Sequence, residues 1–420
     1  MVLDKQETRS SLLGADDLLA ELIRIPSTYE HEHAILAFVE SYLNRLGVPF
    51  TRVPYDGERL RTLPSALPPF STVEGRHCLV ARYKGLGEGP TIVLNCHLDI
   101  VPAGPTETWT HPPFSGHIDE SRVIFGRGAM DDKAGVALAL LVLQSLVVKG
   151  ERLAGDLVIQ FVLEDEITGN GTLLCLDAGH GGDAAIILDG TRGQTAINKH
   201  AGNLQFSLKV QGRPASVSVS HMGLNAAETM FELLLRLRRE ILALNEGCPA
   251  PWSQFPSPNQ FSTQSVNAIG RPLTVPDDAE ALCYMTFTPP NTLQSIRAQI
   301  EDTVRKFAIE RTVPDISVRW DECFFAEVVD SKDTALEKSM QAVAETLKRP
   351  LGFVPSTGTS DMRHFVARGI PCVLFGPGRG FNPHRADERF HLEDLDWMTP
   401  MVVEIVRHWT AQKRPAALPA

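Results

Sequence analysis

Hydrophobic residues recur at helical spacing in two segments near the start of the chain, and the second segment ends at a glycine. Three short apolar runs follow at 91–96, 157–163 and 185–188, and a long apolar stretch of helical character begins after Lys133. Short buried runs separated by a helix are typical of a parallel sheet that helices cover. The first part of the chain is therefore predicted to have an α/β fold.

The pattern changes near residue 200, where apolar and polar residues alternate from 203 to 210. A helical pattern then covers 226–244, and strand-like segments and a second helix, at 293–309, come after it. Alternation of this kind predicts strands with one exposed face. We therefore expect a smaller α+β lid domain inserted into the first domain.

The helical pattern returns after residue 334, and an apolar run at 371–375 with a closing helix at 395–412 completes the α/β part. The larger domain is therefore expected to be discontinuous in sequence. The predicted boundaries are 1–198 and 325–420 for the α/β domain and 199–324 for the lid.

The charge, the apolar runs and the cysteines of the chain limit the classes of function that it can have. The 420 residues carry a formal net charge of -11, so the chain offers no surplus of basic surface for nucleic acid. The N-terminal segment lacks the apolar core of an export signal, and the longest nearly apolar run, 134–148, is shorter than the ~20 residues of a membrane span. Seven cysteines without CxxC pairs favour a reducing compartment. We expect a cytoplasmic protein that binds neither nucleic acid nor membrane.

Side chains that can bind metal follow the predicted strands. His97 and Asp99 end the first strand, in NCHLDIVPAG, at the edge where open α/β sheets hold their sites. Asp131 and Asp132 lie in a glycine-rich turn before the long helix. Each motif alone also has an ordinary structural interpretation, a structural histidine for the first and an aspartate that caps the helix for the second.

More acidic residues follow the other strands. Glu164, Asp165 and Glu166 come directly after the second strand, Asp189 ends the third, and His384 lies in a Gly/Pro-rich loop after the last. Two imidazoles and at least three carboxylates at strand ends suit Zn²⁺, Mn²⁺ or Co²⁺ rather than a thiolate site. The combination indicates a site for two divalent metal ions.

The order of these motifs resembles that of the metallohydrolase family that contains aminoacylase, carboxypeptidase G, succinyl-diaminopimelate desuccinylase and acetylornithine deacetylase. The matching segments span nearly the whole chain: HLDIVPAG, WTHPPFSG, GRGAMDDKAG, the acidic triplet before GNGT, IILDGT, TGTSDMRHF and GPG…HRADE. The resemblance implies a zinc-peptidase-like catalytic domain with an inserted lid. It also implies two bound ions, Zn²⁺ or Mn²⁺, with Co²⁺ as a further candidate.

The resemblance assigns a place to each candidate ligand. Asp131 would bridge both ions. His97 and Asp189 would complete the ligands of one ion, and Glu166 and His384 those of the other.

The resemblance assigns the catalytic roles to Asp165 and Asp99. Asp165 would take a proton from metal-activated water and later return it to the leaving nitrogen, while Asp99 would orient His97. The family has glutamate as its base, so the base here is one methylene shorter. A closer metal, water or substrate would restore its reach, or Glu164 could assist; an inactive relative is the alternative.

The lid departs from the family at residues that contact substrate. Ser216 stands where a histidine usually stabilises the oxyanion, and His221 and Asn267 are candidate replacements. The usual arginine of an Asp-x-Arg element is absent, because YMT occupies 284–286. The remaining candidates for an anion partner are Arg363 and Arg379.

We therefore expect a metal-dependent hydrolase that removes an acyl group from the nitrogen of a small, amino acid-like molecule. The alternative is hydrolytic deamination of an activated aromatic amine, as in the family relative nitroanthranilate aminohydrolase, because attack on a ring carbon needs no peptide oxyanion hole. A dipeptidase comes third, and a non-catalytic scaffold last, since every metal position is filled. The resemblance further implies a small-molecule substrate and a homodimer formed through the lid.

Overall fold

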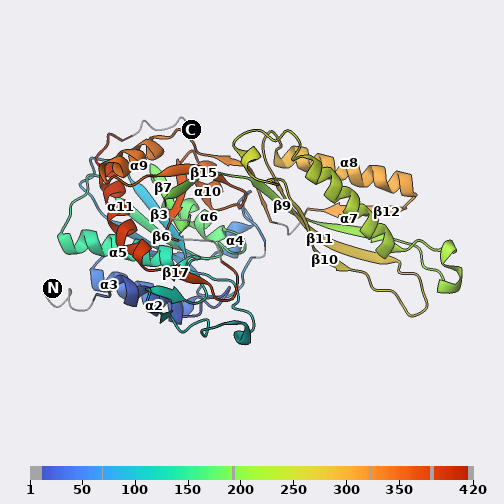
Figure 1. Ribbon diagram of the computed structural model, residues 1–420, viewed down its shortest axis with the longest axis horizontal. Coiled ribbons are helices and arrows are strands. Elements are labelled where there is room, and N and C mark those ends of the chain that lie inside the picture. Colours follow the sequence, from blue (N-terminus) through green and yellow to red (C-terminus); the bar gives the residue numbers. More distant parts are fainter. Residues whose placement is uncertain (1–11, 69, 192–193, 321–323, 379–382, 415–420) are drawn as a thin grey trace.

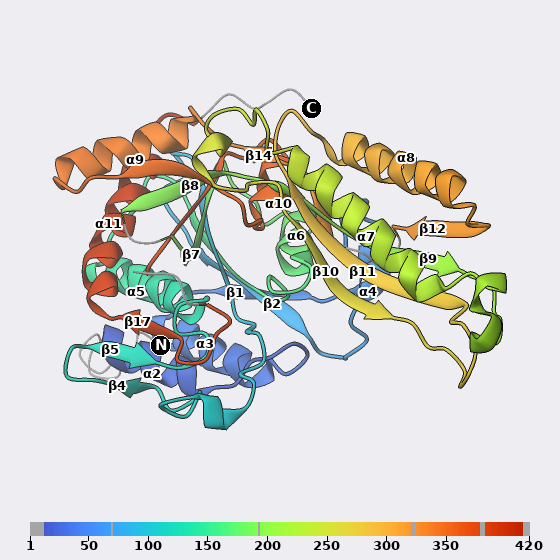
Figure 2. The same ribbon diagram turned by 45° about the vertical axis from the view of Figure 1, so that its right-hand side comes forward.

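The protein has two bodies, a large α/β body and an elongated arm that projects from it, as the computed structural model shows (Figure 1). The structure describes residues 12–68, 70–191, 194–320, 324–378 and 383–414. A view turned by 45° shows the same division, with two long helices lying along the arm (Figure 2).

A nine-stranded sheet forms the centre of the α/β body. Its strands are β1 (Phe50–Pro54), β2 (His77–Tyr83), β3 (Ile92–His97), β6 (Leu157–Val162), β7 (Ala184–Gly190), β8 (Thr195–His200), β14 (Val329–Asp330), β15 (Gly352–Ser356) and β16 (Cys372–Gly376). They lie in the order β1-β2-β6-β3-β7-β16-β8-β14, with β15 beside β8. The central strands β6, β3, β7 and β16 pair in parallel. The predicted α/β fold with a mainly parallel, helix-covered sheet is confirmed.

The helices described in the α/β body are α2 (Ala15–Arg24), α3 (His33–Leu46), α4 (Gly57–Leu60), α5 (Lys133–Lys149), α6 (Asn170–Asp177), α9 (Ala335–Thr346), α10 (Met362–Val366) and α11 (Glu393–Thr410). Strands of the sheet are contacted by α3, α5, α6, α10 and α11, while α2 packs on α5 and α9 packs on α11. Every residue of α5 from 133 to 143 is buried. A helix that is apolar all round belongs in the interior, and α5 lies there because it contacts β3 and β7 as well as α2 and α11.

The arm, here named the lid, has its own antiparallel sheet and its own core. Its elements are β9 (Gly202–Gln211), α7 (Ala226–Ala243), β10 (Phe261–Asn267), β11 (Asp278–Phe287), α8 (Leu293–Arg311), β12 (Asp315–Arg319) and β13 (Phe325–Ala326). Buried residues alternate along β9 and β11, and the buried face forms a core with α7 and α8. The α+β character of the lid is confirmed, and the boundaries 199 and 324 stay a prediction.

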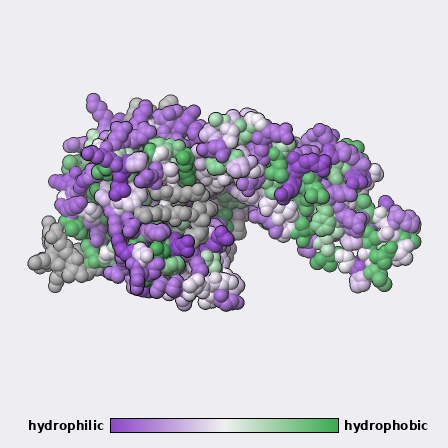
Figure 3. All heavy atoms as spheres, in the orientation of Figure 1, coloured by the Kyte–Doolittle hydropathy of each residue, from purple (hydrophilic) through white to green (hydrophobic). Residues whose placement is uncertain are grey.

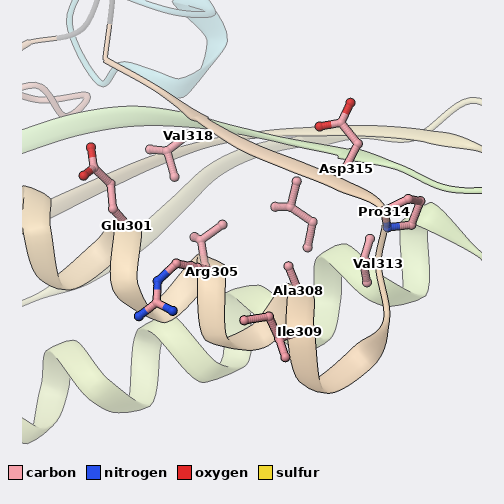
Figure 4. Close-up of a pocket in the computed structure, with 10 residues that line it drawn as sticks. Glu301, Arg305, Ala308, Ile309, Val313, Pro314, Asp315 and Val318 are labelled. Carbon is pink, nitrogen blue, oxygen red and sulfur yellow. The ribbon is translucent and has the colours of Figure 1, made fainter.

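Hydrophobic patches lie along the lid and at its outer end (Figure 3). Phe231 and Leu235 of α7 are 54% and 63% exposed. A shallow groove of about 380 Å³ lies between α8 and β12 (Figure 4), and the predicted metal-binding residues do not line it. No described helix combines the length and apolar character needed to cross a bilayer. The described cysteines are free thiols, and the cytoplasmic location stays a prediction.

Candidate metal centre

Three neighbouring parallel strands deliver polar side chains to one edge of the large sheet. β3 lies between β6 and β7 and ends at His97. The segment after β6 carries Asp165 and Glu166, and β7 carries Asp189 near its end. Because parallel strands end at the same edge, residues distant in sequence meet there.

Two loops complete the cluster. Asp131 lies in the turn before α5, and His384 lies in the loop between β16 and β17 (Arg389–His391) with a left-handed φ of 62°. β17 pairs with β5 (Val123–Phe125). This pairing fastens the loop that carries His384 beside the turn that carries Asp131.

The five predicted ligands form two groups that share Asp131. The donor atoms of His97, Asp131 and Asp189 lie within 4.8 Å of one another, as do those of Asp131, Glu166 and His384. Nε2 of His97 is 3.0 Å from one carboxylate oxygen of Asp131, and Nε2 of His384 is 3.1 Å from the other. This arrangement is compatible with one carboxylate between two cation positions.

The electrostatics of the cluster fit bound cations. Burial and the carboxylate of Asp131 raise the pKa of Glu166 to about 7, and burial raises the pKa of Asp189 well above its usual value. Oε1 of Glu166 is buried without a hydrogen-bond partner among the described residues. Crowded carboxylates resist ionisation unless positive charge balances them. Imidazole and carboxylate donors in this arrangement suit Zn²⁺, Mn²⁺ or Co²⁺.

Asp165 faces the cluster, whereas its neighbour Glu164 does not. Oδ2 of Asp165 is 3.9 Å from Nε2 of His97, and burial raises the pKa of the Asp165 carboxyl. The carboxylate of Glu164 is buried elsewhere and accepts hydrogen bonds of 2.6 Å from both Tyr55 and Arg76. Glu164 is therefore committed to a separate network and is not placed to assist as a base.

Asp99 supports the cluster in two ways. Its backbone carbonyl lies 2.9 Å from Nδ1 of His97, while its carboxylate is 3.7 Å from that nitrogen. The carboxylate accepts the backbone N–H groups of Asp165 at 3.4 Å and Glu166 at 3.3 Å. The carbonyl of Asp99 thus orients the imidazole, and its carboxylate orders the segment that carries the predicted base.

Among the predicted substrate contacts, Arg363 lies near the cluster. Its Nη2 donates to the carbonyl of Thr168, its guanidinium lies 4.9 Å from the ring centre of Phe324, and its charge lowers the pKa of Asp165 against the effect of burial. The predicted lid contacts occupy exposed positions and belong to neither group of candidate ligands: Ser216, His221 and Asn267. Arg379 lies outside the described residues.

Two polar networks, one beside the cluster and one between the lid and the α/β body, were not predicted. The buried carboxylate of Glu388 accepts backbone N–H groups of the turn before α5 and pairs with Arg127. Asn203 of β9 donates to Tyr284 of β11 and to Thr359 before α10, so it links the lid to the α/β body. Glu388 belongs to the HRADE segment, which could have drawn attention to it. Asn203 lies in an ordinary alternating strand, and no sequence signal marks it.

Comparison with known proteins gives one family and relatives of nearly equal length. Residues 93–408 match the family model described as Peptidase family M20/M25/M40. Succinyl-diaminopimelate desuccinylase of Methylorubrum extorquens is 29% identical over 399 residues, which cover 91% of this chain and 95% of that protein. N-formyl-4-amino-5-aminomethyl-2-methylpyrimidine deformylase of Bacillus subtilis (strain 168) is 23% identical over 414 residues, which cover 90% of each chain.

Solved structures share both bodies of the fold. A tripeptidase of Staphylococcus aureus subsp. aureus Mu50 matches 98% of this chain and 100% of its own, with a TM-score of 0.74 and 18% identity. A dinuclear metal-binding M20 peptidase of Bacillus subtilis matches 97% and 99%, with a TM-score of 0.66 and 15% identity. At these identities the likeness establishes the fold alone.

Proposed function

Because the chain belongs to peptidase family M20/M25/M40, whose hydrolases act on amide carbon–nitrogen bonds, we propose that it is a dinuclear-metal amidohydrolase. Its proposed reaction removes an acyl group from the nitrogen of a small, amino acid-like molecule. The observation that carries the proposal is the pair of candidate cation positions that share Asp131. Relatives whose names describe removal of a succinyl and a formyl group support the choice of an acyl substrate.

The proposed ligands divide between the two ions. His97 and Asp189 would hold one ion, Glu166 and His384 would hold the other, and Asp131 would be available to both. When bound, two cations of the Zn²⁺, Mn²⁺ or Co²⁺ class would polarise the scissile carbonyl and lower the pKa of the attacking water.

Asp165 is the proposed general base. Its carboxylate lies beside the cluster, 3.9 Å from Nε2 of His97, where it can accept a proton from the attacking water and pass it to the leaving nitrogen. The carboxylate of Asp99 holds the backbone N–H of Asp165. The shorter side chain therefore starts from a fixed backbone position.

Arg363 is the proposed partner for an oxygen of the substrate. Thr286, at the place of the family's lid arginine, is buried, and its hydroxyl donates to the carbonyl of Pro258 at 2.8 Å. Thr286 is therefore engaged within the lid. Substrate recognition shifts toward the α/β body, and the exposed lid candidates would take part only if the lid closes.

The same lid departures favour a second candidate reaction, hydrolytic deamination of an activated aromatic amine. Attack on an electron-poor ring carbon forms no peptide-type oxyanion, so the lid histidine is dispensable. Its place is taken by Ser216, whose hydroxyl lies 2.9 Å from that of Ser218. In this reaction the water oxygen replaces the amino group, and ammonia leaves.

Product analysis separates the candidates. Metal-loaded protein is incubated with N-acyl amino acids, dipeptides and substituted anthranilates, and metal-free protein is the control. We expect release of a carboxylic acid and an amine from an acyl substrate. Release of ammonia from an anthranilate would instead support deamination of an aromatic amine, and cleavage of dipeptides alone would indicate a dipeptidase. Protein that carries two ions and turns over none of these substrates would refute all three.

We further propose that the protein forms a homodimer through the lid. β10 is an edge strand of the described lid sheet. The adjacent helix α7 exposes Phe231 and Leu235. Exposed apolar side chains beside an open strand edge favour association between copies.

A further inference from the structure

We propose that Glu388 is a positioning residue for metal binding, because its buried carboxylate holds the turn that presents Asp131 to both cation positions. The inference rests on the proposed metal centre and adds to it a residue that belongs to neither group of candidate ligands. Glu388 is fully buried, and it lies four positions after His384.

Both carboxylate oxygens of Glu388 bind the turn. Oε1 accepts the backbone N–H groups of Met130 at 3.0 Å and Asp131 at 3.2 Å. Oε2 accepts the N–H of Gly128 at 3.1 Å and the guanidinium of Arg127 at 2.5 Å. One carboxylate thus accepts from four hydrogen-bond donors. One of these donors is the backbone N–H of Asp131, the ligand that both groups share.

Arg127 extends this network to the other ligand-bearing loops. Its Nη1 also donates to the carbonyl of Arg385, the residue after His384, at 3.3 Å. Its Nη2 donates to the carbonyl of Pro102, in the loop that follows His97, at 3.5 Å. The pair formed by Arg127 and Glu388 therefore connects three of the loops that supply candidate ligands.

The pair is too deeply buried to act as a weak surface ion pair. The side chains of Arg127 and Glu388 are 2% and 1% exposed, and the ring of Trp109 lies 5.3 Å from the guanidinium carbon. Removing the carboxylate would leave its backbone donors without their acceptor and the buried guanidinium charge without its counter-ion. Gly128 has a φ of 79°, and a Cβ there would lie 2.6 Å from a methyl group of Ile100. The turn is therefore packed too tightly to find other partners easily.

A shift of this turn would change the binding of both ions, because Asp131 belongs to both groups of candidate ligands. Partners that orient metal ligands typically change metal affinity by about 10- to 100-fold. Loss of the Glu388 carboxylate is therefore expected to weaken the binding of both ions together. Loss of Asp189 or His384 would instead remove a ligand from one ion.

The test is a Zn²⁺ titration of metal-free wild-type and Glu388→Gln protein, with the visible spectrum of the Co²⁺-loaded forms as a second readout. We expect about 10- to 100-fold weaker Zn²⁺ binding in the variant and an altered Co²⁺ spectrum. The matched control is Glu337→Gln. Glu337 is also buried and accepts a backbone N–H, from Asp333 at 2.6 Å, but it lies in α9 and contacts no proposed ligand. Its substitution is expected to leave both readouts unchanged.

A double variant guards against simple misfolding. Glu388→Gln leaves the buried charge of Arg127 unpaired, whereas Glu388→Gln with Arg127→Met removes both charges. A folded single or double variant with wild-type Zn²⁺ affinity and Co²⁺ spectrum overturns the inference. Failure of both variants to fold also overturns it, because Glu388 would then be a general folding residue. A wild-type chain that binds fewer than two ions refutes the proposed function instead.

Discussion

The chemistry proposed for this chain depends on the reach of Asp165. The base expected from the resemblance is a glutamate, and the aspartate found here is one methylene shorter. Its backbone N–H is held by the carboxylate of Asp99, and the preceding Glu164 is anchored by Tyr55 and Arg76. The position of the base is therefore set by a rigid backbone segment rather than by side-chain flexibility.

Replacing Asp165 by asparagine is expected to lower kcat by about 10²- to 10⁴-fold, because the amide cannot accept the proton. Metal content should stay at two ions per chain, since Asp165 belongs to neither group of candidate ligands. Steady-state kinetics and elemental analysis check both statements. Asp165→Glu is the control and should retain more activity than Asp165→Asn. Near wild-type turnover in Asp165→Asn would show that another group is the base.

Sequence reasoning selected the candidate ligands because they share a position at strand ends and turns. His97 and Asp189 end apolar strands, so the pattern alone placed them at one sheet edge. Placing His384 beside Asp131 required the family resemblance, because no local pattern joins the two loops. Glu388 was missed since its partners include backbone N–H groups, and a sequence does not display which backbone groups a side chain will bind.

At the scale of elements, the sequence predicted those that are buried on every side. β3, β6 and α5 are mostly apolar because they have few or no solvent-facing positions, and Asn95 of β3 and Gln160 of β6 are buried and hydrogen-bonded to each other. β10 was not predicted, because six of its seven residues are exposed and no alternation marks it. The order in which β6, β3 and β7 lie side by side depends on contacts between distant segments, so the sequence alone did not supply it.

The junction between β8 and β9 contains a buried imidazole that makes stability depend on pH. Burial lowers the pKa of His200 to about 4, and the charge of Arg363 acts in the same direction, with His364 also nearby. An unfolded histidine has a pKa of about 6.5. Between these values the unfolded chain binds a proton that the folded chain does not. Stability therefore falls as pH falls through this window.

Metal-free wild-type protein should lose stability more steeply than His200→Gln below pH ~6.5, by about 1.4 kcal/mol per pH unit. Denaturant unfolding of both proteins at several pH values between about 7 and 4 measures the two slopes. The variant also serves as the control for all other titrating groups, which the two proteins share. Parallel slopes would contradict this, because they would show that His200 takes up a proton in the folded protein as readily as in the unfolded chain.

At the scale of the whole molecule, the candidate metal centre and the lid belong to different bodies. The five candidate ligands lie in the α/β body, whereas the departures at Ser216 and Thr286 lie in the lid. The chain passes between the bodies at β8–β9 and returns at β13–β14. Substrate recognition by the lid can therefore change while the metal centre keeps its donors, which is the pattern that this sequence shows.

If the protein is a homodimer through the lid, charged substitutions on the lid should convert it into a monomer. Wild-type protein should scatter light as twice the chain mass of 46.1 kDa. The double variant Phe231→Glu with Leu235→Glu should scatter as a single chain, because charges replace the exposed apolar side chains of α7. Leu86→Glu is the control, since Leu86 is 50% exposed on the α/β body. A wild-type monomer, or a double variant that stays dimeric, would exclude this interface.

The most direct test of the central claim is the number of divalent ions that each chain retains after loading with Zn²⁺ or Mn²⁺ and dialysis. The account predicts two ions for the wild-type protein and one for Asp189→Ala. It predicts none for Asp131→Ala, because both groups of candidate ligands depend on that carboxylate. A wild-type chain that retains fewer than two ions, or an Asp131→Ala variant that keeps both, would contradict a dinuclear centre at this site.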